Sequence, residues 1–384
     1  MKVLLYTYDL VPGTERLMPW RTLLEVARWM NGTQRYEAAV CSGGGPEGMR
    51  QYEGVRIYGI DPTVEALKDF IAQGAWDVVC YPVTFRQGLK NIGDLADVPA
   101  KMIAYIPGGL YPLPGVFRLM KDGHWKRALP YLLDSLTPHR LLARKLHRAG
   151  IGQLICQAPL TAQHALRCGW KQEEVFCALP GKESSVQADS TLPDKLGIAG
   201  QRYLLFSGAP APTRGAVLAL RAFDRVADRI PEVKLVMLMR RDAGSDFSEF
   251  EAAAGKLKHK DQVLVVYDRV SREQLFGMFA SAWAVLLPFL VVPSEIPLTF
   301  FEVMGLGAPV ITFENGGTTD YLRNALMIAR KRNEKCLGDA MIRMCRDEAE
   351  RDRLSAAAKE QLCNHPTWEE TAAIWAKATD SLNA

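Results

Sequence analysis

The sequence has no long hydrophobic run and no strong excess of charge of either sign. No apolar stretch approaches the roughly 18 residues of a membrane-spanning helix. The formal net charge is +4 over 384 residues, which suits contact with anionic small molecules but is too small for a nucleic-acid-binding surface, so no nucleic-acid partner is expected. The opening segment, MKVLLYTYDLVPG, does not have the pattern of a signal peptide. We therefore expect a cytoplasmic protein that is soluble or at most peripheral at the inner membrane face.

Metal-binding and disulfide patterns are also missing from the sequence. The eight cysteines are scattered, none forms a Cys-x-x-Cys pair, and no cluster of histidines accompanies them. Most cysteines lie in apolar stretches, where they are typical small buried residues. The sequence therefore predicts a reducing compartment, no disulfide framework and no metal site.

What is present is apolar material for two α/β domains. With 48% hydrophobic and 23% charged residues over 384 positions, the chain exceeds what one core usually organises. Strand and helix patterns alternate up to position 181 and again from 203, which predicts parallel sheets with helices on both faces. The polar stretch 182–200 is typical of a linker. We expect two doubly wound, Rossmann-like domains whose ligands bind in the cleft between them.

One segment, 292–322, combines several features of a phosphate-binding site. A strand is expected to end near Pro288, and Pro297 stands where a helix would begin, since a missing N–H costs nothing there. The free first-turn amides of this helix would form an anion site suited to a diphosphate; they belong to Leu298, Thr299 and Phe300. Glu302 follows within reach of a ribose, and Gly316-Gly317 allows close backbone approach to a ligand.

The order of these features resembles the retaining glycosyltransferases of family 4, which have the two-domain GT-B fold. The matching residues are Glu302-Val303-Met304, Gly307-Ala308-Pro309-Val310-Ile311, Gly316-Gly317 and Asp320. One departure concerns the family's first glutamate, which is separated from the second by seven residues. Here six residues separate Glu295 from Glu302, and Ser294 fills the family position. Either Glu295 takes the first role after a one-residue shift, or the role is lost.

The resemblance extends upstream and to the chain end. Arg214-Gly215 matches the family's phosphate-binding Lys-Gly pair, but after Gly208 the chain has Ala209 where the family has an arginine. The segment around Arg269 and Val270 resembles the part that cups the nucleotide base. The terminal stretch from 365 resembles the family's last helix, which returns to the first domain. The resemblance implies four parts: an acceptor-binding domain (1–181), a linker (182–200), a nucleotide-sugar-binding domain (201–364) and a C-terminal helix on the first domain (365–384).

The N-terminal half resembles the family only in its general pattern. The histidine that family members commonly carry near the strand 102–106 is missing, and His124 is expected to be an ordinary surface residue. The turn Gly108-Gly109 is either part of the acceptor side of the cleft or a plain strand-ending turn. The basic segment 139–148, with Phe117 and Trp125, either lies on an anionic membrane face or forms a solvated helix side.

As an expectation from the resemblance, the protein moves a hexose from a nucleoside diphosphate sugar to an acceptor hydroxyl with retention, in cell-surface polysaccharide or glycolipid synthesis. Arg214 and the helix start at Leu298 and Thr299 would stabilise the leaving diphosphate. Glu302 would bind the ribose and Glu295 a sugar hydroxyl. No Asp-x-Asp motif indicates an obligatory metal, and no cofactor is expected. The acceptor would be a sugar, a glycolipid or a small molecule.

Two other functions fit the same fold. With Ala209 in the arginine position and no N-domain histidine, the chain could serve as a catalytically weak GT-B binding or scaffolding subunit. A sugar-nucleotide epimerase on the same fold is a third hypothesis, against which the segment around Glu302 argues.

Overall fold

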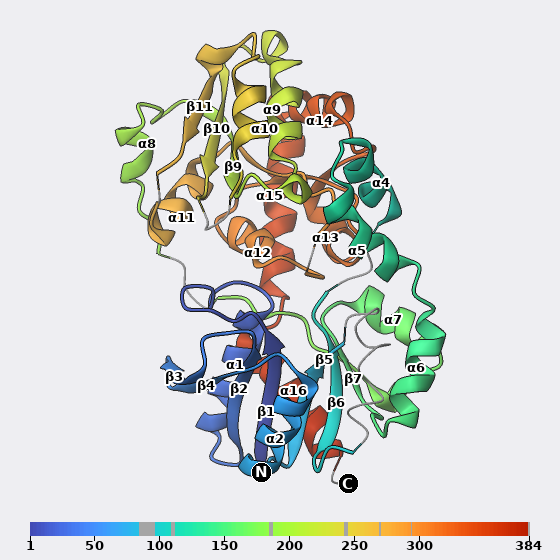
Figure 1. The fold of residues 1–384 in the computed structure, drawn as a ribbon. Coiled ribbons are helices and arrows are strands. Elements are labelled where there is room, and N and C mark those ends of the chain that lie inside the picture. Colours follow the sequence, from blue (N-terminus) through green and yellow to red (C-terminus); the bar gives the residue numbers. More distant parts are fainter. Residues whose placement is uncertain are drawn as a thin grey trace.

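The structure, a computed structural model, describes residues 1–83, 97–108, 112–183, 187–241, 245–268, 270–292 and 294–382. Two sheets organise it, one in each half of the chain (Figure 1). The first has the order β3-β4-β2-β1-β5-β6-β7-β8 and is parallel except for the β3–β4 pair. The second has the order β11-β10-β9-β12-β13-β14 and is parallel throughout. The predicted pair of doubly wound, Rossmann-like domains is confirmed.

The elements have the following bounds. The first sheet comprises β1 (Lys2–Tyr8), β2 (Glu37–Gly43), β3 (Gly48–Tyr52), β4 (Val55–Ile60), β5 (Val78–Pro82), β6 (Lys101–Ile106), β7 (Leu154–Cys156) and β8 (Val175–Cys177). The second sheet comprises β9 (Arg202–Gly208), β10 (Val233–Met239), β11 (Val263–Val266), β12 (Ala284–Leu287), β13 (Val310–Phe313) and β14 (Leu326–Ala329).

The helices up to the second sheet are α1 (Trp20–Gly32), α2 (Val64–Gly74), α4 (Leu113–Lys121), α5 (Trp125–Ser135), α6 (His139–Arg148), α7 (Pro159–Arg167) and α8 (Thr191–Lys195). The later helices are α9 (Ala216–Asp224), α10 (Ser248–Ala254), α11 (Arg272–Ser281), α12 (Leu298–Gly305), α13 (Gly316–Leu322), α14 (Glu334–Arg346), α15 (Glu348–Cys363) and α16 (Trp368–Ser381). No helix among the described residues combines the length and apolarity needed to cross a bilayer.

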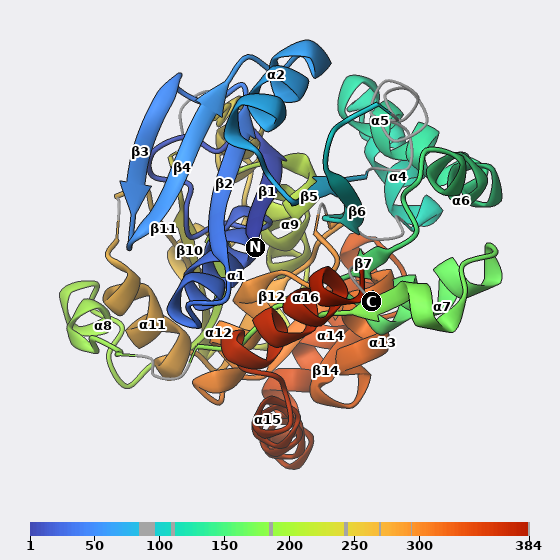
Figure 2. The ribbon, with the colours of Figure 1, turned by 90° about the horizontal axis from the view of Figure 1, so that it is seen from below.

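Both faces of each sheet are covered, which explains the near-continuous apolar strands. In β1, Leu4 and Tyr6 enter one core cluster, whereas Val3 and Leu5 enter the cluster on the opposite face. The strand is therefore buried on both sides, as is typical of parallel sheets flanked by helices. The helix α16 packs beside α1 on the second of these faces, where Trp375 contacts the Tyr105 ring at 5.3 Å between centroids (Figure 2).

The helices α4 and α5 pack on the second sheet's domain, although they precede position 181 in the chain. Val116, Leu119 and Ala128 belong to the core cluster that surrounds β9 and β10 (Figure 1). A Cβ on Gly115 would lie 1.8 Å from the Leu290 carbonyl oxygen, so α4 sits directly against the loop after β12. The segment 113–148 forms three helices, α4, α5 and α6. The predicted first domain, 1–181, therefore includes two helices that pack on the second sheet's domain.

The chain crosses between the two halves near Gly181 and again near His365. Lys182 pairs with Thr367 in a parallel bridge, and its Nζ donates to the carbonyls of Leu362 and Cys363 at 2.7 and 2.9 Å. The two crossings are thus tied to each other. The expected linker, 182–200, contains α8, and Leu192 of this helix is part of the second domain's core.

Candidate functional site

The helix α12 begins as the sequence predicted, directly after Pro297. Phe300 N–H donates to the Pro297 carbonyl at 3.1 Å. Among the described residues, no acceptor is found for the backbone N–H groups of Leu298 and Thr299. These two amides lie at the positive end of the helix dipole, so an anionic group is stabilised there. Ser294, in the preceding loop, is buried.

Glu302 lies one turn further along α12 and is largely covered by protein. Its side chain is 21% exposed, and Arg272 Nη2 lies 3.4 Å from its Oε1. Burial raises the pKa of Glu302, and the Arg272 charge lowers it again in part. A cavity of about 250 Å³ adjoins the carboxylate, and the crossing residues Lys182 and Glu183 line it together with Trp368. Glu302 therefore meets a cavity where the two halves join, as a ligand-binding residue would.

Arg272 and Glu302 are part of a larger ion cluster that spans both halves of the chain. Arg272 also pairs with Glu183 at 3.1 Å, and Glu183 pairs with Arg21 of α1 at 3.4 Å. Arg21 in turn contacts Glu25. We call these five residues the interdomain ion cluster. Sequence reasoning missed it because its members come from α1, the crossing, α11 and α12, and no local pattern connects them.

Arg214 lies at the carboxyl end of β9, in a short 3-10 helix formed by Pro212–Arg214. Its Nη1 would be 2.8 Å from a Cβ at Gly208, so the glycine makes room for the guanidinium. The guanidinium carbon stands 5.6 Å from the Phe289 ring centroid. The same ring lies 6.0 Å from that of Phe300, in the first turn of α12. Phe289 therefore lies near both Arg214, the residue predicted to bind phosphate, and the start of α12.

Glu295 lies in the buried loop before α12, and its sugar-hydroxyl role remains a prediction. It is 3% exposed, and its Oε2 accepts a hydrogen bond from the Gln157 backbone N–H at 2.7 Å, directly before α7. Burial raises its pKa to about 8, an effect partly offset by the Thr161 hydroxyl and the amides of Gln157 and Ala158. The structure thus places Glu295 at the N-terminal end of an N-domain helix, where it joins the two halves.

Gly316 and Gly317 also lie at this junction. Gly316 begins α13, and a Cβ on Gly317 would come within 3.0 Å of the Ala158 Cβ. Thr318 Oγ1 donates to the Glu295 carbonyl at 2.7 Å. The structure therefore explains this glycine by close packing of α13 against α7, and its contact with a donor remains a prediction.

The remaining predicted residues are divided between described and undescribed parts of the chain. Gly108 is buried after β6, and Val270 packs against the second domain's core. Arg269 and Gly109 lie outside the described residues. His124, expected to be an ordinary surface residue, lies near Glu249 at 3.2 Å between the paired atoms.

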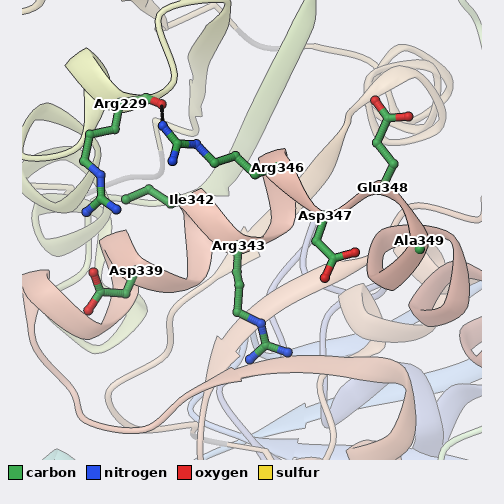
Figure 3. Close-up of a pocket in the computed structure, with 8 residues that line it drawn as sticks. All are labelled: Arg229, Asp339, Ile342, Arg343, Arg346, Asp347, Glu348 and Ala349. Carbon is green, nitrogen blue, oxygen red and sulfur yellow. Dashed lines mark hydrogen bonds between the residues drawn. The ribbon is translucent and has the colours of Figure 1, made fainter.

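A larger hollow, of about 720 Å³, is formed by α14, the start of α15 and Arg229 (Figure 3). Arg346 in its wall donates to the Arg229 carbonyl at 2.8 Å. None of the predicted site residues lines this hollow, so we place the candidate site at the interdomain cavity instead.

The chain is similar to known proteins in sequence and in fold. The family model described as glycosyl transferases group 1 matches residues 189–361. D-inositol 3-phosphate glycosyltransferase from a Nocardioides species is 26% identical over 209 residues, which cover 50% of this chain and 43% of that protein. The chain thus matches less than half the length of this curated relative.

Solved structures resemble the chain over nearly its whole length. Sucrose-phosphate synthase from Thermosynechococcus elongatus has a TM-score of 0.76 at 15% identity, covering 99% of this chain and 98% of that one. HepE from Anabaena, solved in complex with UDP and glucose, has a TM-score of 0.71 at 13% identity, covering 99% and 100%. At such identities the likeness shows the fold alone.

Proposed function

We propose that this protein, which has the GT-B fold and a glycosyl transferases group 1 domain at residues 189–361, transfers a sugar from a nucleoside diphosphate to an acceptor hydroxyl with retention. The observation that carries the proposal is that Phe289 lies near both Arg214, at 5.6 Å from its guanidinium carbon, and Phe300 in the first turn of α12, at 6.0 Å between ring centroids. A cation near free helix amides suits a diphosphate leaving group. HepE, solved with UDP and glucose, supports a nucleotide sugar as donor.

In this proposal the protein positions the reactants and stabilises the leaving group. Arg214 and the amides of Leu298 and Thr299 neutralise charge as it develops on the diphosphate. Glu302 binds the ribose hydroxyls from the interdomain cavity. The acceptor hydroxyl attacks from the face that the diphosphate leaves, and a donor phosphate oxygen takes its proton. This sequence of events needs no protein nucleophile, which agrees with the Glu295 carboxylate being held at α7.

The acceptor binds on the N-terminal side of the cleft, near Gly108, and is a glycolipid or another membrane-linked sugar. Most of the large apolar side chains exposed among the described residues come from the segment 113–141. Phe117 and Trp125 are 55% and 60% exposed. The next helix, α6, adds exposed cations. Apolar side chains beside cations suit peripheral contact with an anionic leaflet.

A catalytically weak binding or scaffolding subunit is the second candidate function. Two observations favour it: Ala209 stands in place of the family's phosphate-binding arginine, and Glu295 is buried at the domain junction. Such a protein would bind nucleotide sugars without consuming them.

One experiment separates the two functions. Thermal unfolding of the full chain is measured with UDP, GDP, ADP and TDP sugars, since a bound ligand raises the apparent stability. The stabilising sugar is then incubated with pooled acceptors, and release of the nucleoside diphosphate is followed. Stabilisation with release supports the transferase, and stabilisation without release supports the binding subunit. No stabilisation by any sugar contradicts both.

A further inference from the structure

Three potential metal ligands meet between α6 and α7, in a place for which sugar transfer has no use. His139 is the first residue of α6, His164 lies in α7, and Cys168 follows directly after α7. His139 Nδ1 faces His164 Nε2, with the two rings edge to face. Cys168 Sγ lies 3.5 Å from the same Nε2. The three atoms all lie within 4.8 Å of one another.

We propose that His139, His164 and Cys168 bind one Zn²⁺ ion and thereby fasten α6 to α7. Two imidazole nitrogens and a thiolate are the ligand types that zinc prefers, at about 2.0 Å from nitrogen and 2.3 Å from sulfur. At tetrahedral angles these bond lengths put sulfur and nitrogen about 3.5 Å apart, which agrees with the Cys168–His164 separation of 3.5 Å. The two histidine nitrogens lie closer together than the roughly 3.3 Å that two Zn–N bonds at the tetrahedral angle require, so the rings must move apart to admit the ion.

The backbone brings the ligands together without depending on a flexible loop. His164 and Cys168 are four residues apart, so they project from the same side of α7. Pro138 precedes α6 and sets its first turn, which carries His139. The two helices lie side by side at one edge of the first sheet (Figure 1). The ligand set is therefore held largely in place before an ion arrives.

The three ligand side chains are all partly buried, so an ion between them would be shielded from bulk water. Metal binding would displace the Cys168 thiol proton.

The size of the space identifies the class of ligand. A cavity of about 20 Å³ adjoins the three side chains, with Thr161, Leu146 and Trp170 in its wall. This volume holds one water or one ion and excludes an organic molecule. Three protein ligands leave one position for water, and the apolar wall limits access to it. We infer a structural role: the ion fixes α6 against α7, whose other end receives the Glu295 carboxylate.

The test uses the full chain after treatment with a chelator, titrated first with Co²⁺ and then with Zn²⁺. The proposal expects one Co²⁺ per chain, a thiolate-to-cobalt charge-transfer band, and loss of the band when Zn²⁺ displaces cobalt. Cys168→Ser should abolish the band, and His139→Asn should weaken binding at least about tenfold, as is typical for losing one ligand contact. Cys363→Ser is the matched control because Cys363 is exposed and distant in sequence; it should behave as the parent.

Thermal unfolding provides a second measurement. Zn²⁺ should raise the unfolding temperature of the parent and of Cys363→Ser, but not of Cys168→Ser. If the parent shows no charge-transfer band, or if the band persists in Cys168→Ser, the proposal is wrong and the two imidazoles share only a hydrogen bond. The parent titration decides this even if a variant fails to fold. Neither measurement depends on sugar transfer, so its outcome is independent of the proposed function.

Discussion

The Glu295 carboxylate accepts a hydrogen bond from the Gln157 backbone N–H at 2.7 Å, across the junction of the two domains. This contact places a buried acid from the C-terminal half at the start of α7, an N-domain helix. An acid at a helix N-terminus is stabilised by the helix dipole, but complete burial opposes its charge. Burial is the larger effect here, since the pKa of Glu295 is raised to about 8.

The raised pKa predicts that stability falls as the pH rises. The folded protein binds a proton on Glu295 up to about pH 8, whereas an unfolded glutamate releases it near 4.5. The stabilising contribution is therefore complete below pH 4.5 and is lost as the pH rises through 8. Between these values the free energy of unfolding should fall by on the order of 1 kcal/mol per pH unit. Glu295→Gln should remove this slope.

Urea unfolding of the parent and of Glu295→Gln between about pH 6.5 and 8 checks the prediction. The comparison cancels contributions from groups common to both proteins, including His365, whose pKa burial lowers to about 4. Glu173→Gln, at an exposed position, serves as the control and should keep the parent's slope. Equal slopes in the parent and in Glu295→Gln would show that Glu295 is ionised in the folded protein.

Arg214→Ala should slow transfer strongly. No arginine stands at Ala209 to share the diphosphate charge, so Arg214 carries more of it. The expected cost is about 2–4 kcal/mol of transition-state stabilisation, as for losing one preorganised charge-stabilising group. Turnover with the donor found by thermal unfolding measures this, with Arg225→Ala as an exposed arginine control. A rate within about threefold of the parent would mean that another group holds the diphosphate.

Glu302→Gln should weaken nucleotide binding through the ribose. If the carboxylate accepts hydrogen bonds from the ribose hydroxyls, the parent should prefer a ribonucleotide over its 2′-deoxy analogue, and the variant should lose most of this preference. Calorimetric titration with both nucleotides provides the measurement. Glu183→Gln is the matched control, because Glu183 shares Arg272 with Glu302. If both variants change the preference equally, the effect comes from Arg272 rather than from ribose contact.

The sequence predicted those parts of the fold and site that depend on neighbouring residues. The start of α12 at Leu298 was expected, because the proline before it is a local signal. By contrast, α4 and α5 were placed in the first domain by chain order, whereas Val116 and Leu119 pack on the second. Their apolar faces do not indicate which core they join.

The convergence of His139 with His164 and Cys168 was missed for a related reason. Only His164 and Cys168 have helical spacing. His139, the third ligand, lies 25 residues before His164 and on another helix. The expected absence of a histidine cluster followed from the lack of a local motif. The position of Glu295 could not be predicted either, because it depends on how closely α13 approaches α7 at Gly317. The packing of α4 and α5, the convergence of the three ligands and the position of Glu295 all depend on contacts between elements distant in sequence.

The last prediction concerns attachment to anionic membranes through α4–α6. Phe117 and Trp125 are exposed, and the next helix along the chain, α6, presents four exposed cations: Arg140, Arg144, Lys145 and Arg148. Each cation near an anionic leaflet contributes roughly 1 kcal/mol, so the four together should hold the protein reversibly. The apolar rings would add contact area at the interface. We expect the parent to sediment with vesicles that contain phosphatidylserine at low salt, and to be released as the salt concentration rises.

Replacing all four cations of α6 by glutamate should abolish sedimentation and leave donor binding unchanged, because the proposed donor-binding residues lie in the second half of the chain. A control with the same change in net charge replaces four exposed cations elsewhere: Arg225, Lys256, Lys258 and Lys260. This control separates a local surface from the overall charge of +4, since only a local surface would make the α6 variant fail while the control still binds. Trp125→Ala should weaken binding even at low salt, because its contribution is apolar and therefore not screened by ions. If the parent does not bind anionic vesicles at low salt, the cations of α6 face only solvent, and a soluble acceptor is favoured.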